Sequence, residues 1–158
     1  MLCAGWLQDI LEYTDTSFDE LFEKFGRRIS TLILSLTKTK LVIDTSDDST
    51  LSLTKKRTIS KKQRQKEYGI KIKESEIDVK LIKLCDISTN LGNLKNQLIS
   101  KTKKRRILKE LRYYTVIIEK DLIEETRYPK ANTLLETINE NIKIQTQNIN
   151  KNKKIKLK

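Results

Sequence analysis

The stretch "AGWLQDILEYTDTSFDELFEKFG", residues 4–26, carries the pattern of two helices. In its first half, apolar side chains recur every three or four residues, which is typical of a helix with one buried face. Residues 14–16 interrupt this pattern, and Ser17 and Glu20 then have the spacing of a capping box that begins a second helix. Gly26 suits the left-handed position at which such a helix ends. The stretch therefore predicts an all-α fold.

The rest of the chain continues the helical pattern. Only one Pro and four Gly occur in 158 residues, so the usual helix breakers are nearly absent. Further helices are expected at about 28–37, 60–73, 76–94, 103–125 and from Pro129 to about 145. Residues 38–58 lose the pattern and are predicted to form a mobile loop, and residues 146–158 a basic disordered tail. The prediction is one helical domain over residues 1–145.

The net charge of +12 attracts phosphates, nucleic acids and anionic surfaces through its long-range field. Basic clusters lie at 55–57, 61–66 and 101–106 and in the tail. Two interpretations stay open, a solvated basic surface and a protein that binds nucleic acid or other phosphates. Aromatic residues make up only 6% of the chain and no base-stacking motif occurs, so a nucleic-acid partner is not expected.

Two cysteines, Cys3 and Cys85, stand among apolar neighbours without C-x-x-C spacing. They are expected to be buried thiols of a reducing compartment. No apolar run reaches the roughly 20 residues that span a bilayer. Residues 1–11 also lack the basic start of a secretion signal. These features predict a cytoplasmic protein without a membrane partner.

Acidic side chains occur at helical spacing in two distant apolar segments. Asp9 and Glu12 are one turn apart, and Asp86 and Asn90 are one turn apart within "VKLIKLCDISTNLGNL". Two carboxylates on buried helices are costly unless they are paired, hydrogen-bonded or bound to a metal. One interpretation is a divalent-cation site. The other is that Asp9 caps a helix or pairs with Lys83 or another base, while Asp86 faces solvent.

An ordered series of motifs adds to this pattern. The segment that begins "AGWLQDILEYT" resembles the A-x-L-H-D-x-x-E-D-T segment of the HD-domain hydrolases that remove the 3′-pyrophosphate from guanosine-3′,5′-bis(diphosphate), (p)ppGpp. Downstream, "KKQRQKEY" resembles the basic R-K-x-x-Y helix of that family. "IKLCDISTNLGNL" resembles its V-K-L-A-D-x-x-x-N-x-x-x-L helix, and "NTLLETINENI" its closing helix. The resemblance covers residues 3–142 in order and spacing.

The resemblance implies an HD-domain-like helical bundle with one divalent ion, usually Mn²⁺, held between two His and two Asp, and a metal-dependent (p)ppGpp hydrolase activity. Asp9 and Asp86 match the two metal-binding aspartates. Glu12 matches the first acid of the pair that handles the attacking water, which makes it the candidate catalytic residue. Positions near the nucleotide are matched by Lys83, Asn90 and Asn93.

The chain departs from the family at the positions that carry the chemistry. Gln8 stands where the family has the His of its H-D pair, and an amide oxygen is a weaker ligand for a transition metal than imidazole. Tyr13 replaces the second acid. The first metal-binding His belongs to a helix upstream of this chain's start, so the N-terminal helices of the family are missing, and the chain contains no His. We expect a weak or lost Mn²⁺ site and a pseudoenzyme.

The expected partner is therefore a guanine nucleotide of the (p)ppGpp type. Without the family's upstream helices, the apolar face around Trp6, Leu7 and Ile10 is predicted to be exposed. Such a face favours self-association or docking to a full-length relative. The alternative is a basic helical protein that binds phosphate or nucleic acid, or docks to a partner, without catalysis.

Overall fold

The computed structural model describes residues 1–38, 42–43, 57–58 and 60–154, which are almost entirely helical. The helices are α1 (Leu2–Leu7), α2 (Ile10–Tyr13), α3 (Phe18–Leu36), α4 (Lys61–Glu74), α5 (Ile77–Asn96), α6 (Lys101–Ile123) and α7 (Pro129–Lys154). Two short strands, β1 (Val42–Ile43) and β2 (Arg57–Thr58), pair antiparallel. The all-α prediction is confirmed. Most of the predicted loop at 38–58, and residues 155–158 of the predicted tail, lie outside the described residues.

The helices begin where the sequence supplies caps. Ser17 Oγ accepts a hydrogen bond from the backbone N–H of Glu20 at 3.2 Å, while the Glu20 carboxylate accepts from the N–H of Ser17 at 2.8 Å, completing the predicted capping box. Ser60 and Ser100 cap α4 and α6 through the serine side chain alone, which accepts a hydrogen bond from the backbone N–H of Gln63 and of Lys103, respectively. Inside α3, Gly26 has φ 75° and ψ 169°, so the element is two helices joined at a kink. A positive φ was predicted there, but its ψ lies in a region open essentially to glycine alone.

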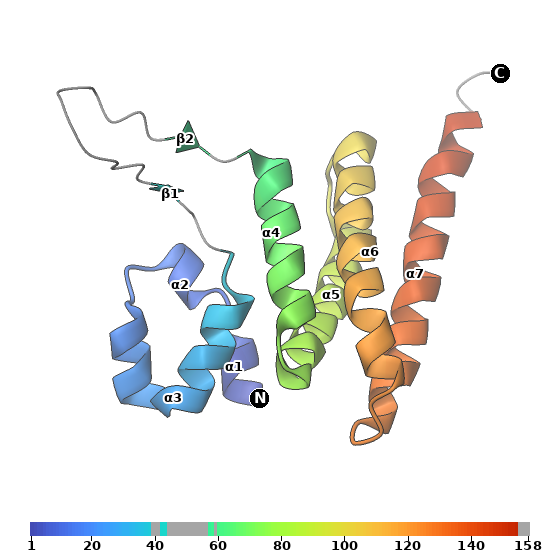
Figure 1. The fold of residues 1–158 in the computed structure, drawn as a ribbon. Helices are drawn as coiled ribbons and strands as arrows, with labels where there is room; N and C mark the ends of the chain where they lie inside the picture. Colours follow the sequence, from blue (N-terminus) through green and yellow to red (C-terminus); the bar gives the residue numbers. More distant parts are fainter. Residues whose placement is uncertain (39–41, 44–56, 59, 155–158) are drawn as a thin grey trace.

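The long helices form the main body of the molecule. Helices α5, α6 and α7 pack on one another, α4 packs on α6, and α1 and α3 pack on α5 (Figure 1). Their shared core is aliphatic and includes Leu84, Ile87 and Leu91 of α5, Leu108, Ile118 and Leu122 of α6, and Leu135, Ile138 and Ile142 of α7. Burial of these side chains supplies most of the driving force for the bundle. Within the described residues, no helix combines the length and the apolar run needed to cross a bilayer.

Polar contacts join α3 to its neighbours. Helix α4 supplies donors to the carbonyl groups at the end of α3. Tyr68 Oη donates to Leu36 O at 2.8 Å, and Lys71 Nζ donates to Thr37 O at 3.1 Å. At the start of α5, the buried Asp78 carboxylate accepts hydrogen bonds from Arg28 and from Tyr128 Oη. These contacts satisfy helix-end groups that would otherwise be unpaired.

Two sequence predictions about the elements are wrong. The first helix does not run through to Leu11, because it ends at Leu7 and restarts as α2 at Ile10. Helix α7 continues to Lys154 through the segment predicted to be disordered. Buried Ile142, Gln145 and Ile149 explain this, because their spacing keeps one face of the helix on the core.

The predicted burial of the two thiols is also wrong, because Cys3 and Cys85 are both exposed. Cys85 directly follows Leu84, which is fully buried. Successive residues of a helix point about 100° apart, so an apolar neighbour in sequence does not place a side chain in the core.

Candidate functional site

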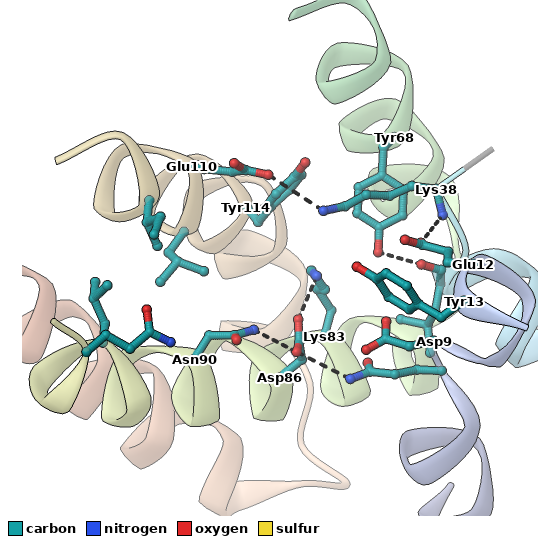
Figure 2. Close-up of a pocket in the computed structure, with 16 residues that line it drawn as sticks. Asp9, Glu12, Tyr13, Lys38, Tyr68, Lys83, Asp86, Asn90, Glu110 and Tyr114 are labelled. Carbon is teal, nitrogen blue, oxygen red and sulfur yellow. Dashed lines mark hydrogen bonds and ion pairs between the residues drawn. The ribbon is translucent and has the colours of Figure 1, made fainter. Parts of the chain in front are cut away.

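Segments from the two halves of the chain meet around a cavity of about 330 Å³ (Figure 2). The first segment is the turn between α1 and α2 with α2 itself, the second is the end of α3, and the others belong to α4, α5 and α6. The cavity is lined by Gln8, Asp9, Glu12, Tyr13, Leu36, Lys38, Tyr68, Lys83, Asp86, Asn90, Leu94, Gln97, Ile107, Glu110, Leu111 and Tyr114. Asp9 and Asp86, predicted to meet, line the same cavity.

The carboxylate of Asp86 is the centre of a hydrogen-bond network. Lys83 Nζ lies 2.7 Å from Asp86 Oδ2, and both residues project from one face of α5. Asn90 Nδ2 donates to Asp86 Oδ1 at 2.8 Å, and Gln8 Nε2 donates to the same oxygen at 3.3 Å. The last bond joins residues 78 positions apart and links the N-terminal turn to α5. Asp86 is therefore half-buried and fully engaged, and does not face solvent as the alternative interpretation expected.

Two ammonium groups lie against two tyrosine rings. Lys83 Nζ is 5.4 Å from the ring centroid of Tyr68 and 5.2 Å from that of Tyr114. Lys38 Nζ is 5.4 and 5.9 Å from the same centroids, and its nearest carboxylate is Glu110 at 3.6 Å. At these distances the faces of the rings attract the cations. Aromatic faces thus hold both ammonium groups at the cavity.

Burial changes the two tyrosine hydroxyls at the site. It is the main cause that raises the pKa of Tyr68 and of Tyr114 above the ordinary value, and nearby carboxylates add to the effect. Tyr68 Oη has a partner in Leu36 O. Tyr114 Oη is buried and has no hydrogen-bond partner among the residues that the structure describes. The wall of the cavity therefore includes one polar atom whose bonding capacity is unused.

The N-terminal residues at the cavity, Asp9, Glu12 and Tyr13, have different surroundings. Glu12 Oε1 accepts a hydrogen bond from the backbone N–H of Lys38 at 2.6 Å, just beyond the end of α3. Asp9 is exposed and occupies the N-cap position of α2 without making a side-chain cap bond. Tyr13, at the position of the family's second acid, is 80% exposed. Glu12 thus has a structural bond where the resemblance implies a catalytic acid.

The cavity contains most of the predicted site residues and several that the sequence did not indicate. Gln8, Asp9, Glu12, Lys83, Asp86 and Asn90 line it, but Asn93 does not. On α5 the cavity-facing series continues from Asn90 to Leu94 and Gln97, four and seven residues on, so Asn93 lies on an exposed face. Lys38, Glu110 and Tyr114 were missed. The helical spacing of Glu110 and Tyr114 on α6 is a signal that could have paired them.

The donor set does not fit a manganese centre. Of the four carboxylates at the cavity, Asp86 and Glu110 face ammonium groups and Glu12 accepts a backbone bond. Within the described part of the chain, no three His, Cys, Asp or Glu side chains are grouped so that they could hold a metal ion. A cation at Asp86 would also have to displace the ammonium of Lys83.

Comparison of this chain with protein-family models, with curated proteins and with solved structures gave no match. The similarity to the (p)ppGpp hydrolases consequently rests on the order of the motifs in the sequence. The geometry of the cavity is independent of that similarity.

Proposed function

We propose that this chain is a catalytically reduced relative of the (p)ppGpp hydrolases that binds a phosphorylated guanine nucleotide and does not hydrolyse it at a useful rate. One observation carries the proposal. Three of the four motifs that resemble the family supply Gln8, Tyr68 and Asp86 to one cavity, whereas the closing motif at 132–142 supplies no lining residue. This convergence supports the proposal because the resemblance implies that these three motifs share one site.

The cavity offers groups suited to a nucleotide. The ammonium groups of Lys83 and Lys38 can contact phosphate oxygens, and the amides of Gln8, Asn90 and Gln97 can bond to base or ribose. The buried hydroxyl of Tyr114 can donate one further hydrogen bond. Against this, four carboxylates line the cavity with only two ammonium groups. A phosphate must compete with Asp86 for Lys83, so we expect the affinity to be modest.

The same contacts argue against turnover. Glu12 is bonded to the backbone of Lys38, and the position of the second acid is occupied by an exposed tyrosine. Among the described residues that line the cavity, only the carboxylate of Asp9 has no hydrogen-bond or ion-pair partner, and the two positions that the family uses to handle the water do not offer a free general base. The proposal is therefore one of binding without efficient hydrolysis.

Calorimetric titration with ppGpp, with GDP as the comparison nucleotide, tests the binding. Asn90→Ala is expected to weaken ppGpp binding by about five- to tenfold, the typical value of one hydrogen bond. Asn93→Ala is the matched control, since it removes the same side chain from the same helix outside the cavity. Equal effects of the two variants, or no saturable binding of ppGpp by the natural chain, would refute the proposed site.

Chromatographic assay of ppGpp with Mn²⁺ present tests the absence of turnover. We expect no pyrophosphate release above the uncatalysed rate. Release that is abolished by Asp86→Ala would show that the site is an active hydrolase centre and would overturn the second half of the proposal.

A further inference from the structure

A second groove, of about 830 Å³, lies between the N-terminal halves of α4 and α6. Five of the residues that line it are cations, Lys61, Lys62 and Lys66 from α4 and Arg106 and Lys109 from α6. Glu110 is its one acidic lining residue within the described part of the chain. In the sequence the basic clusters at 61–66 and 101–106 are far apart, but in the fold the first cluster shares this groove with Arg106, the last residue of the second.

The cations of the groove are available to a ligand. Glu110 faces Lys38 at 3.6 Å on the side of the other cavity. Glu67, the acidic residue within the basic part of α4, accepts a hydrogen bond from Gln63. Among the described residues, no carboxylate forms an ion pair with the five groove cations. The groove therefore keeps a strongly positive potential.

The positions of these cations are unfavourable for the helices themselves. Helices α4 and α6 begin at the same end of the bundle (Figure 1), and neither has an acidic residue in its first turn. Residues 61–68 and 101–112 contain eleven Lys or Arg and two Glu. Cations near a helix N-terminus oppose the helix dipole, whereas an anion there is stabilised by it. A bound polyanion would offset the repulsion between these cations and the N-terminal ends of both helices. Residues that are unfavourable for local stability in this way are expected at functional sites.

Tyr113 adds an aromatic surface to the groove. Its side chain is partly exposed at 36%, and its ring lies edge-on to Tyr114 with centroids 5.3 Å apart. Gly69 on α4 makes room for it, because a Cβ at that position would be 2.5 Å from Tyr113 Oη. The ring is therefore held in place before any ligand arrives.

We propose that this groove binds the phosphodiester backbone of a single-stranded nucleic acid, with Tyr113 as a stacking surface for a base. The cations recur at one-turn intervals along both helices, as at Lys62 and Lys66, so the groove can contact successive phosphates. A positive groove with an adjacent aromatic ring is the usual combination for sequence-tolerant single-strand binding. The groove adjoins the nucleotide cavity at Glu110, but its cations do not line that cavity, and the proposal does not depend on nucleotide binding. It also departs from the expectation in the sequence analysis, where few aromatic residues and the lack of a base-stacking motif argued against a nucleic-acid partner.

Fluorescence anisotropy with labelled oligo-dT and oligo-U of about 12 nucleotides, over a salt series, tests the proposal. The groove variant combines Lys62→Gln, Lys66→Gln, Arg106→Gln and Lys109→Gln. The control variant combines Lys73→Gln, Lys95→Gln, Lys130→Gln and Lys143→Gln, which removes the same charge from exposed positions outside the groove. We expect the groove variant to lose at least about tenfold in affinity and to reduce the salt slope by about 3, at roughly 0.7 per phosphate contact. The control variant is expected to stay within about twofold.

Further measurements distinguish a defined binding site from nonspecific attraction by the net charge of the protein. Tyr113→Leu is expected to weaken single-strand binding severalfold. Tyr113→Phe is expected to keep the affinity of the natural chain, because it keeps the aromatic face on which a base stacks. Circular dichroism checks that each variant is folded. Equal losses in the groove and control variants, no saturable binding by the natural chain, or a duplex bound as tightly and without any effect of Tyr113→Leu would each overturn the proposal. Asn90→Ala, which affects only the nucleotide cavity, should leave these affinities unchanged.

Discussion

Single side chains determine what the nucleotide cavity can do. Asp86 receives one ammonium and two amide donors, so both of its oxygens are engaged. The carboxylate holds these three donors in position, and it can bind a new cation only if Lys83 moves. The tyrosine rings beneath Lys83 favour its present position, because they attract the ammonium from the other side. The chemistry of Asp86 therefore follows from its partners rather than from its residue type.

The two buried tyrosines should respond in opposite ways to loss of the hydroxyl. Tyr114→Phe is expected to raise the free energy of unfolding by about 1 kcal/mol, because it removes a buried polar atom without a partner. Tyr68→Phe is expected to lower it by about 1 kcal/mol, because Leu36 O loses its donor. Urea unfolding of both variants measures the difference. If Tyr114→Phe destabilises the protein, its hydroxyl has a partner in solution.

The same hydroxyls predict a loss of stability at alkaline pH. Burial raises the pKa of Tyr68 and Tyr114, so the unfolded chain ionises near pH 10 while the folded chain keeps both protons. The contribution of the two protonated tyrosines to the free energy of unfolding is therefore complete below about pH 10. It is lost as the pH rises above that value, by about 1.4 kcal/mol per pH unit for each tyrosine. Urea unfolding at a series of alkaline pH values tests this. The double variant Tyr68→Phe and Tyr114→Phe should show a shallower fall, and an unchanged slope would contradict the assignment.

At the scale of elements, local signals in the sequence placed most of the helix starts and ends. Ser17 with Glu20, Ser60 and Pro129 each act within one turn of the chain, so they could be recognised without knowledge of the fold. The break between α1 and α2 could not, since no Gly or Pro marks Gln8 and Asp9. The extension of α7 was missed because polar composition was weighed above the spacing of Ile142 and Ile149.

Gly26 is expected to be required by the backbone alone. At its φ of 75° and ψ of 169°, Gly26→Ala should lower the free energy of unfolding by about 1–3 kcal/mol. No atom lies within 4 Å of the Cβ that would be added, so the cost contains no steric clash. Gly92→Ala is the control, because that Cβ is also free of contacts and the position is helical. It should raise stability by about 0.5–1 kcal/mol. Chemical denaturation of the two variants gives both values, and effects of the same sign would contradict the explanation.

The last turns of α7 are expected to contribute to stability. Ile149 is 8% exposed, so Ile149→Ala should lower the free energy of unfolding by about 2 kcal/mol. Ile144 on the same helix is 44% exposed, and Ile144→Ala should cost less than about 1 kcal/mol. Thermal unfolding of the pair provides the comparison. Equal, small effects would mean that this end of α7 frays in solution, as the sequence first suggested.

At the scale of the whole molecule, the fold produces two neighbouring sites of different character. Glu110 lines both, and from there the acidic cavity opens towards α2 and α5 while the basic groove follows α4 and α6. The order and spacing of the motifs predicted that Asp9 and Asp86 share one site, and both line the cavity, but the bond from Gln8 to Asp86 was not predicted. The roles of Lys38 and Tyr114, and the joining of two basic clusters, depend on how helices distant in sequence pack together. Such tertiary contacts leave no periodic signal in one sequence.

The exposed apolar face of α1 predicts self-association. Of the face predicted to be exposed, Trp6 is 89% exposed, but Leu7 and Ile10 are partly buried against the core. Leu2, which is 84% exposed, lies one turn before Trp6 on the same face of the helix. Burying both between two copies removes apolar surface from water, so sedimentation velocity should show dimers that increase with concentration, and Trp6 emission should shift to shorter wavelength in parallel. Leu2→Ser should weaken both effects. Leu98→Ser is the control, because Leu98 is equally exposed but lies between α5 and α6. A chain that remains monomeric at all concentrations, or an equal effect of Leu98→Ser, would show that the α1 face is merely solvated.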